Sequence, residues 1–136
     1  QRGKPIFGIC LGMQLFAKIG NEFRETDGIG IIDGNIQKIK TKNPKTLIPH
    51  VGWNNIRERN TSVLLKNIKT DDSFYFVHSF TYANVNSDYV TGISDYDAEL
   101  VSVIEQENIF GVQFHPEKSQ KPGLQLIKNF VFDNAC

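Results

Sequence analysis

The feature that most constrains the fold is a short apolar run that ends at a cysteine between two glycines, Gly8-Ile9-Cys10-Leu11-Gly12. Residues 6–9 are apolar and predict a short buried strand. Apolar residues then recur at helical spacing, at Leu11, Leu15, Phe16 and Ile19. We therefore predict a helix over residues 11–19 that stops at Gly20. A strand that turns directly into a helix is typical of α/β domains.

The rest of the chain adds mostly strands. Residues 29–32 and 36–39 flank Asp33-Gly34, which predicts a hairpin. Residues 38–45, with four lysines, read as an exposed loop. Further strands are predicted over 73–80, 89–93, 100–104 and 109–114, with a turn at 105–108, and a helix over 124–132 whose apolar side is formed by Leu124, Ile127 and Val131. The expected fold is one α/β domain with a mixed sheet flanked by helices.

Composition excludes several function classes. The chain of 136 residues has 15 basic and 15 acidic side chains, which gives no electrostatic reason to expect a nucleic acid or an anionic membrane as partner. No apolar run approaches the roughly 20 residues of a membrane span, and no signal-peptide pattern opens the chain. Two cysteines are too few for a disulfide framework. We expect a cytoplasmic protein, with Cys136 incidental.

Cys10 is the first candidate for chemistry. A nucleophile on a tight strand-to-helix turn needs a strained backbone, so we expect the glycines on either side, Gly8 and Gly12, to be required. The helix N-terminus would stabilise the thiolate. The backbone amide of Leu11, with Gly12, would face a developing oxyanion. On this pentapeptide alone, a buried cysteine in a glycine-rich turn is an equal alternative.

A second motif, Gly111-Val112-Gln113-Phe114-His115-Pro116-Glu117, supplies a base. An apolar strand ends at His115, and Glu117 follows closely enough to reach its imidazole. A thiol nucleophile needs a base to take its proton and a carboxylate to orient that base. Taken singly, a solvated histidine beside a surface acid would be the simpler interpretation. The two motifs together favour a Cys10–His115–Glu117 triad.

These motifs resemble class I glutamine amidotransferases, and most closely the glutaminase subunits of imidazole glycerol phosphate synthases. The resemblance covers essentially the whole chain. It is carried by residues 5–14, by Pro49-His50-Val51-Gly52-Trp53-Asn54, by residues 74–80 and by residues 110–120. The first and last segments are common across class I, whereas the Pro-His-x-Gly-Trp-Asn segment and Lys118-Ser119-Gln120 are particular to these subunits.

The resemblance implies that Cys10 attacks the side-chain amide of glutamine, with His115 as acid and base and Glu117 as its orienting partner. It also implies substrate contacts from Gln14, Glu22, His78, Ser79 and Phe80. Many relatives have tyrosine where this chain has Phe80, which removes a hydroxyl. Contacts with a synthase partner, a HisF-like (β/α)₈ cyclase, are implied for Pro49, His50, Val51, Trp53, Asn54 and Lys118.

No metal or cofactor is expected. The three histidines, at positions 50, 78 and 115, lack ligand spacing with Cys10, and no phosphate-binding loop is visible. His50 has no carboxylate nearby in sequence and is assigned a structural or interface role.

Only nine residues precede Cys10. Family members carry further strands and a glycine-rich oxyanion loop before this point. Residues 1–136 would therefore be the C-terminal portion of an amidotransferase domain, from the nucleophile elbow onward. We expect this piece alone to be inactive or unstable.

Three functions remain open on the sequence. The first is release of ammonia from glutamine for a cyclase that makes imidazole glycerol phosphate in histidine biosynthesis. The second is a paralogous glutaminase that supplies ammonia for surface-sugar amidation, which residues 20–30 and Val51 favour somewhat. The third is a non-catalytic subunit that keeps the partner surface, against which the intact Cys10, His115 and Glu117 argue.

Overall fold

The computed structural model describes residues 3–134. Cys136, expected to be incidental, lies outside this range. The elements in chain order are β1 (Ile6–Ile9), α1 (Leu11–Leu15), β2 (Ala17–Asn21), β3 (Glu25–Asp27), β4 (Ile32–Lys38), β5 (His50–Asn55), β6 (Arg57–Glu58), β7 (Ser73–His78), β8 (Phe80–Ala83), the 3₁₀ turn η1 (Ser87–Tyr89), β9 (Val90–Asp95), β10 (Glu99–Gln106), β11 (Ile109–Val112), the 3₁₀ turn η2 (Pro116–Lys118) and α2 (Gln120–Asn134).

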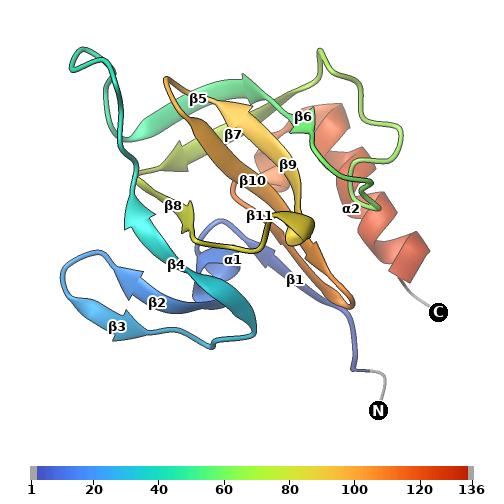
Figure 1. Ribbon diagram of the computed structural model, residues 1–136. Coiled ribbons are helices and arrows are strands. Elements are labelled where there is room, and N and C mark those ends of the chain that lie inside the picture. Colours follow the sequence, from blue (N-terminus) through green and yellow to red (C-terminus); the bar gives the residue numbers. More distant parts are fainter. Residues whose placement is uncertain (1–2, 135–136) are drawn as a thin grey trace.

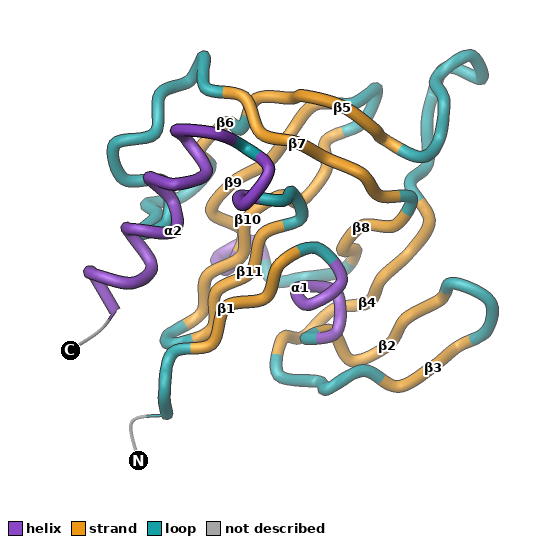
Figure 2. Tube along the Cα trace, turned by 180° about the vertical axis from the view of Figure 1, so that it is seen from behind, coloured by secondary structure: helices purple, strands orange, loops and turns teal. Residues whose placement is uncertain are grey.

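A five-stranded mixed sheet in the order β1-β11-β10-β9-β6 organises the chain. β1 runs parallel to β11, with Ile6 opposite Ile109 and Ile9 opposite Val112, while the other neighbours are antiparallel. The helices lie on opposite sides of this sheet (Figures 1 and 2). The α/β fold class predicted from the sequence is confirmed.

Each face of the sheet covers its own apolar core. Alternation along β1 and β11 sends Phe110 and Val112 to one face and Gly111 to the other. The first core lies on the α2 side and contains Ile56, Leu64, Leu65, Phe74, Phe76, Val103, Phe110, Val112, Phe114 and Leu126. The second lies on the α1 side and contains Met13, Phe16, Ala17, Ile32, Ile36, Tyr82 and Ile104.

A pair of facing glycines lets α1 lie close against the sheet. Gly8 of β1 and Gly111 of β11 are register partners. A Cβ at Gly8 would lie 2.7 Å from the backbone of Gly12 and Met13, and one at Gly111 would lie 2.8 Å from Met13 Cγ. The fully buried Met13 side chain occupies the space that these two glycines leave. Close packing of this helix fixes the turn that carries Cys10.

Two smaller sheets complete the described part of the chain. β2 and β4 pair in parallel, with β3 and β8 outside them in the order β3-β2-β4-β8. β5 and β7 form an antiparallel pair in which His50 faces His78 and Trp53 faces Tyr75. Figure 1 shows the β5–β7 pair beside β9 and β10, away from the β2–β3 hairpin.

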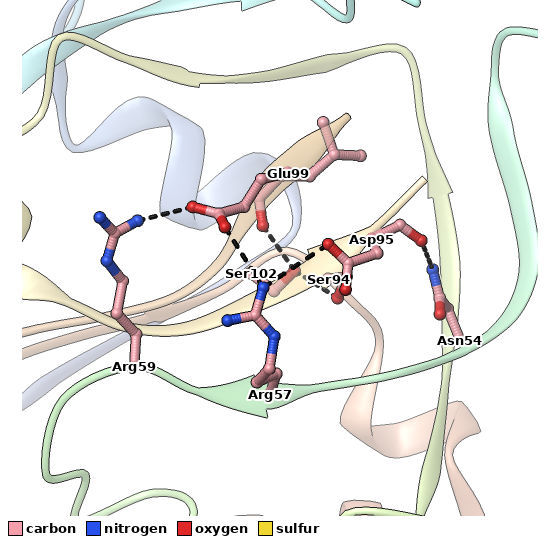
Figure 3. Close-up of polar contacts among 8 residues, drawn as sticks. Asn54, Arg57, Arg59, Ser94, Asp95, Glu99 and Ser102 are labelled. Atoms are coloured by element: carbon pink, nitrogen blue, oxygen red, sulfur yellow. Dashed lines mark hydrogen bonds and ion pairs between the residues drawn. The ribbon is translucent and has the colours of Figure 1, made fainter. Parts of the chain in front are cut away.

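The chain that leaves β5 is tied to the central sheet by polar contacts (Figure 3). Asn54 Nδ2 donates to the carbonyl of Asp95 at 3.0 Å. Arg57 and Arg59 both pair with Glu99, at 3.3 and 2.7 Å. These ion pairs are exposed, and each contributes roughly 0–1 kcal/mol. They set the position of β6 more than they stabilise the fold.

The predicted helix over residues 11–19 is wrong beyond Leu15. The chain turns there and enters β2, where Ile19 pairs with Asp27 and Asn35. The apolar face predicted for the helix does not share one environment: Phe16 is buried, whereas Leu11 is 63% exposed. Leu11 and Leu15 line a pocket instead of a core. Gly20 lies inside β2 and stops no helix.

The predicted hairpin at Asp33-Gly34 is also wrong, because both residues lie inside β4. Pairing with β2 shifts here: Ala17 faces Ile32, whereas Ile19 faces Asn35, so β4 carries one extra residue. Gly34 has φ of 147° at this bulge. Glycine is favoured at such a position because side chains rarely adopt that φ. The Asp-Gly pair therefore bends a strand here.

The C-terminal helix is longer than predicted and buries a different face. Leu124 and Val131, assigned to the apolar side, are exposed, and Ile127 is half-buried. The buried side carries Leu126 and Asn129. Asn129 Nδ2 donates to the carbonyls of Leu64 and Lys66 at 2.8 and 2.7 Å, which satisfies its burial.

The remaining strands differ at their ends. The run over 73–80 is divided at Ser79 into β7 and β8, the predicted turn at 105–108 begins only after Gln106, and the last strand stops at Val112. Between residues 3 and 134, neither helix is long and apolar enough to cross a membrane.

Candidate active site

Cys10 occupies a strained turn between β1 and α1. Its φ and ψ are 52° and −106°, outside the regions that a residue with a side chain normally adopts. Such a backbone costs about 1–3 kcal/mol and persists only where the surroundings impose it. Here the Cys10 amide donates to the carbonyl of Val112 at 2.8 Å, which holds the turn against β11. This geometry is that of a nucleophile elbow.

The two glycines of the elbow are not equivalent. Gly8 is required for space, because a Cβ there would meet backbone atoms at 2.7 Å. A Cβ at Gly12 would meet nothing within 4 Å. The expectation that both are required is therefore wrong for Gly12, which lies within α1 and adopts no unusual φ.

The sulfur of Cys10 is half-buried. Burial raises the pKa of the thiol, while hydrogen bonds from the backbone of Leu11 and the side chain of Gln113 act against that rise. The net direction is opposite to that expected from a helix N-terminus. The physical reasons are desolvation and the shortness of α1, which has only five residues.

His115 and Glu117 are paired beyond the end of β11. His115 Nδ1 lies 2.7 Å from Glu117 Oε1, so Nδ1 carries the proton that the carboxylate accepts. Nε2 has no hydrogen-bond partner within residues 3–134 and can act as a base. Because β1 and β11 are parallel neighbours, Cys10 and His115 follow strands that end at the same sheet edge. They form no direct hydrogen bond; the side chain that contacts the sulfur is Gln113.

The backbone of His115 is held by β7. Its amide donates to the carbonyl of Tyr75 at 2.9 Å. The fully buried Ser119 hydroxyl accepts from the Tyr75 amide at 3.0 Å and donates to the His115 carbonyl at 2.6 Å. Sequence reasoning gave Ser119 no role of its own. Its place in the Lys-Ser-Gln segment after the histidine motif was the only available signal.

A pocket of about 380 Å³ opens beside the elbow. Of the predicted substrate residues, Gln14, Glu22 and Phe80 line it, together with Leu11. Charged residues that sequence reasoning missed, Arg24 and Asp27, also line it. The wall therefore carries carboxylates and a guanidinium, with apolar surface from Leu15, Phe23 and Ile36.

His78 and Ser79, also predicted to contact substrate, do not line this pocket. The buried His78 donates from Nδ1 to the carbonyl of Phe80 at 2.8 Å. The Ser79 carbonyl accepts from the Ile39 amide at 2.9 Å. Both positions support the strand ends around Phe80.

His50 belongs to a buried hydrogen-bond chain. The Phe80 carbonyl can only accept, so His78 Nε2 is unprotonated and accepts from His50 Nδ1 at 2.9 Å. His50 Nε2 in turn accepts from Asn54 Nδ2 at 3.3 Å. Burial lowers the pKa of His50 to about 4 and also lowers that of His78. Of the two roles assigned to His50, this burial favours the structural one.

The other predicted interface residues divide between two faces of β5. Val51 and Trp53 are 53% and 52% exposed and face Val77 and Tyr75 of β7. Pro49 is exposed at the start of the strand. Asn54 turns inward to His50 and Asp95. Lys118 Nζ lies 5.9 Å from the centre of the Tyr75 ring, so it borders the same exposed face.

Comparison with known proteins gives consistent matches. The profile of the family Glutamine amidotransferase class-I matches residues 1–134. The imidazole glycerol phosphate synthase subunit HisH of Pelagibacter ubique (strain HTCC1062) is 44% identical over 128 residues, covering 94% of this chain and 62% of that protein. The same subunit of Methanocaldococcus jannaschii is 44% identical over 127 residues, covering 93% and 63%. The chain thus spans less than two thirds of the length of these curated relatives.

Solved structures agree on the fold. The crystal structure of a glutamine amidotransferase superposes with a TM-score of 0.64 at 17% identity, covering 97% of this chain and 61% of that chain. At that identity the match concerns the fold alone, whereas the family profile spans nearly the whole sequence. This chain belongs to the glutamine amidotransferase class-I family.

Proposed function

We propose that the protein bearing this chain hydrolyses glutamine to glutamate and ammonia through a thioester on Cys10. The observation that carries the proposal is the convergence of a strained cysteine elbow and a His115–Glu117 pair on one sheet edge, beside a pocket with charges of both signs. We further propose that the ammonia passes to a HisF-like cyclase subunit that makes imidazole glycerol phosphate. The HisH names of the relatives support this destination.

The first half of the reaction forms the thioester. Cys10 Sγ attacks the carboxamide carbon of glutamine, and the proton of the thiol passes to His115 Nε2. Glu117 holds Nδ1–H and stabilises the imidazolium that forms. The amides of Leu11 and Gly12 face the developing oxyanion. His115 then returns the proton to the leaving nitrogen, and ammonia departs.

The second half releases glutamate. Water attacks the thioester carbon while His115 Nε2 accepts its proton. Collapse of the tetrahedral intermediate expels the Cys10 sulfur and frees glutamate. Cys10 Sγ and His115 Nε2 share no hydrogen bond in the free chain. Catalytic hydrogen bonds are often long in free enzymes.

The pocket suits the amino-acid end of glutamine. Its volume of about 380 Å³ lies in the range of small-ligand sites. Glu22 and Asp27 supply negative charge for the ammonium group, and Arg24 supplies positive charge for the α-carboxylate. Both Nε2 hydrogens of Gln14 are used, by Phe80 and Gln113, so Gln14 can only accept from the substrate.

The exposed side of the β5–β7 pair suits the partner subunit. Val51, Trp53, Tyr75 and Val77 form a mixed aromatic and aliphatic surface, and Lys118 adds a charge at its border. Aromatic residues are common anchors at protein interfaces. His50 and Asn54 support this surface from behind, through their hydrogen bonds to each other and to the central sheet.

The surface-sugar paralogue is less well supported than the histidine-pathway enzyme. Residues 20–30 and Val51 favour the paralogue somewhat, but relatives of 44% identity carry the HisH name. A non-catalytic subunit is disfavoured by the strained backbone at Cys10, because strain of this kind is normally kept where it serves a site.

The test replaces Cys10 with alanine in the full-length protein assembled with its cyclase, with Cys136→Ala as the matched control. Glutamate release and imidazole glycerol phosphate synthesis are measured with glutamine and, separately, with ammonium salts. Loss of the glutamine-dependent reactions is expected only in the Cys10 variant, while synthesis from ammonia persists. Glutamate release that survives Cys10→Ala would refute the proposal.

A further inference from the structure

Gln113 is a fully buried polar residue in contact with the nucleophile. It follows β11, its exposed fraction is 0%, and its backbone amide donates to the Ser102 carbonyl at 3.0 Å. Its side-chain Nε2 lies 3.7 Å from Cys10 Sγ, and its Oε1 accepts from Gln14 Nε2 at 3.1 Å. A buried carboxamide is costly unless both its ends are paired. Here one of the two partners is the sulfur.

The orientation of this carboxamide is set by its neighbours. Gln14 Nε2 also lies 3.1 Å from the carbonyl of Phe80, which can only accept. The nitrogen of Gln14, and not its oxygen, therefore faces Gln113. Gln113 must present Oε1 to Gln14 and Nε2 to Cys10. The donor direction runs without ambiguity from Gln14 through Gln113 to the sulfur.

We propose that Gln113 is a positioning residue for Cys10, whose side-chain N–H holds the sulfur at the elbow and favours its thiolate form. Its consequence for catalysis rests on the proposed glutaminase function, whereas its effect on the sulfur does not. Gln14 has a supporting part, because it prevents the carboxamide of Gln113 from flipping.

The surroundings explain why the sulfur needs such a donor. Burial and the nearby Glu117 carboxylate both raise the pKa of the Cys10 thiol, and Lys118 and the Leu11 amide lower it. A thiol is a weak acceptor and a thiolate a strong one, so an N–H directed at the sulfur stabilises the charged form more than the neutral form. The side chain of Gln113 therefore offsets part of the burial that the elbow imposes.

The test measures the pH dependence of Cys10 alkylation by iodoacetamide in the full-length protein, with the Cys10 peptide quantified separately from the Cys136 peptide by mass spectrometry. Gln113→Met keeps the length of the side chain and removes its N–H. Gln113→Glu keeps an acceptor for Gln14 and places an oxygen beside the sulfur. Gln125→Met is the matched control, since among residues 3–134 the Gln125 side chain bonds only to Asn129, within α2.

We expect the alkylation midpoint to rise by about one pH unit in Gln113→Met, which corresponds to about tenfold slower alkylation at pH 7. The rise should be larger in Gln113→Glu and absent in Gln125→Met. Gln14→Met leaves Gln113 in place but frees it to flip, and should give a smaller rise in the same direction. This last variant keeps the test decisive if the buried substitutions fail to fold.

An unchanged midpoint in every folded variant would overturn the role of Gln113, whatever happens to glutamate release. If the variants shift the midpoint but the unsubstituted full-length protein with its cyclase releases no glutamate, the role of Gln113 is supported and the proposed function is contradicted. The role of Gln113 is therefore tested by the alkylation midpoint, and the proposed function is tested by glutamate release.

Discussion

The two glycines around Cys10 allow a matched test of how the elbow is built. Gly8 and Gly12 stand at equal distance from the cysteine in sequence, but their surroundings differ. A Cβ at Gly8 would lie 2.7 Å from the carbonyl carbon of Gly12, from the amide nitrogen of Met13 and from a ring carbon of Phe16. A Cβ at Gly12 would have no neighbour within 4 Å.

The magnitudes follow from these distances. Two of the three atoms near Gly8 are backbone, so no rotamer change relieves the contact and α1 must move away from β1 by several tenths of an ångström. Overpacking of this kind costs about 1–3 kcal/mol. Gly12 lies within α1, where alanine is preferred over glycine by about 0.8–1 kcal/mol. The two alanine variants should therefore differ by about 2–4 kcal/mol in the free energy of unfolding.

Urea denaturation followed by far-UV circular dichroism measures this difference directly. In the full-length protein, about 1 kcal/mol corresponds to a few degrees in melting temperature, so Gly8→Ala should melt roughly 10 °C below Gly12→Ala. Gly8→Ala should also slow glutamate release, because the movement of α1 by several tenths of an ångström misplaces the sulfur; a misplacement of 1 Å would cost about 10²-fold, so we expect a loss of roughly tenfold. Equal stability of the two variants would refute the claim that α1 is in close contact at Gly8.

Three further predictions follow from other parts of the chain. Phe114→Ala should lower the free energy of unfolding by about 3–5 kcal/mol, because the ring is fully buried with its centre 4.4 Å from that of Phe74. Phe132→Ala, at a 73% exposed position, should change it by less than about 0.5 kcal/mol, and equal losses in urea titrations would contradict this assignment of the core. Burial lowers the pKa of His50 to about 4, below its value in the unfolded chain, so the folded state binds fewer protons and its stability should be complete above about pH 6.5 and fall by on the order of 3 kcal/mol towards pH 4. His50→Gln should flatten this part of the curve of unfolding free energy against pH, and an unchanged slope would contradict the neutral His50–His78 pair. Glu117→Gln should lower kcat for glutamate release by about 10²–10⁴-fold with little change in KM, because an amide in place of the carboxylate 2.7 Å from His115 Nδ1 neither fixes the tautomer nor stabilises the imidazolium. A kcat within a few-fold of that of the unsubstituted protein would exclude the carboxylate from the mechanism.

Secondary structure is predicted well from the sequence where the residues of one segment are enough to determine whether it forms a strand. β9 and β10 are mostly buried segments bounded by turn residues, and their strands lie close to the predicted ranges. β1 has the predicted range, but it is an edge strand in which Ile6 is exposed, so the prediction that it is buried is wrong. The failures have another cause. Leu11 and Leu15 keep helical spacing with Phe16, but they face a pocket, while Phe16 and Ala17 enter a core built by distant residues such as Ile32 and Tyr82. Local periodicity does not distinguish the wall of a pocket from the side of a core.

The same limit explains α2. Its apolar residues Leu124 and Val131 suggested the core-facing side, but the structure buries the side of Asn129. Asn129 is buried because the carbonyls of Leu64 and Lys66, more than sixty residues away, need a donor at that place. A polar residue that serves a distant backbone reads as solvent-exposed in any local pattern.

The residues of the candidate site also fall into two groups, those that a local motif predicts and those that only the fold identifies. Cys10, His115 and Glu117 could be named from sequence because their chemistry is carried by short motifs at strand ends. Gln113 and Ser119 could not be named in this way, although they lie within the second motif or just after it. Their roles depend on residues far away in the sequence, because Gln113 contacts Cys10 and Gln14, and Ser119 bonds to the Tyr75 amide. Sequence motifs thus predict the groups proposed to react, and only the tertiary structure shows the groups that hold them.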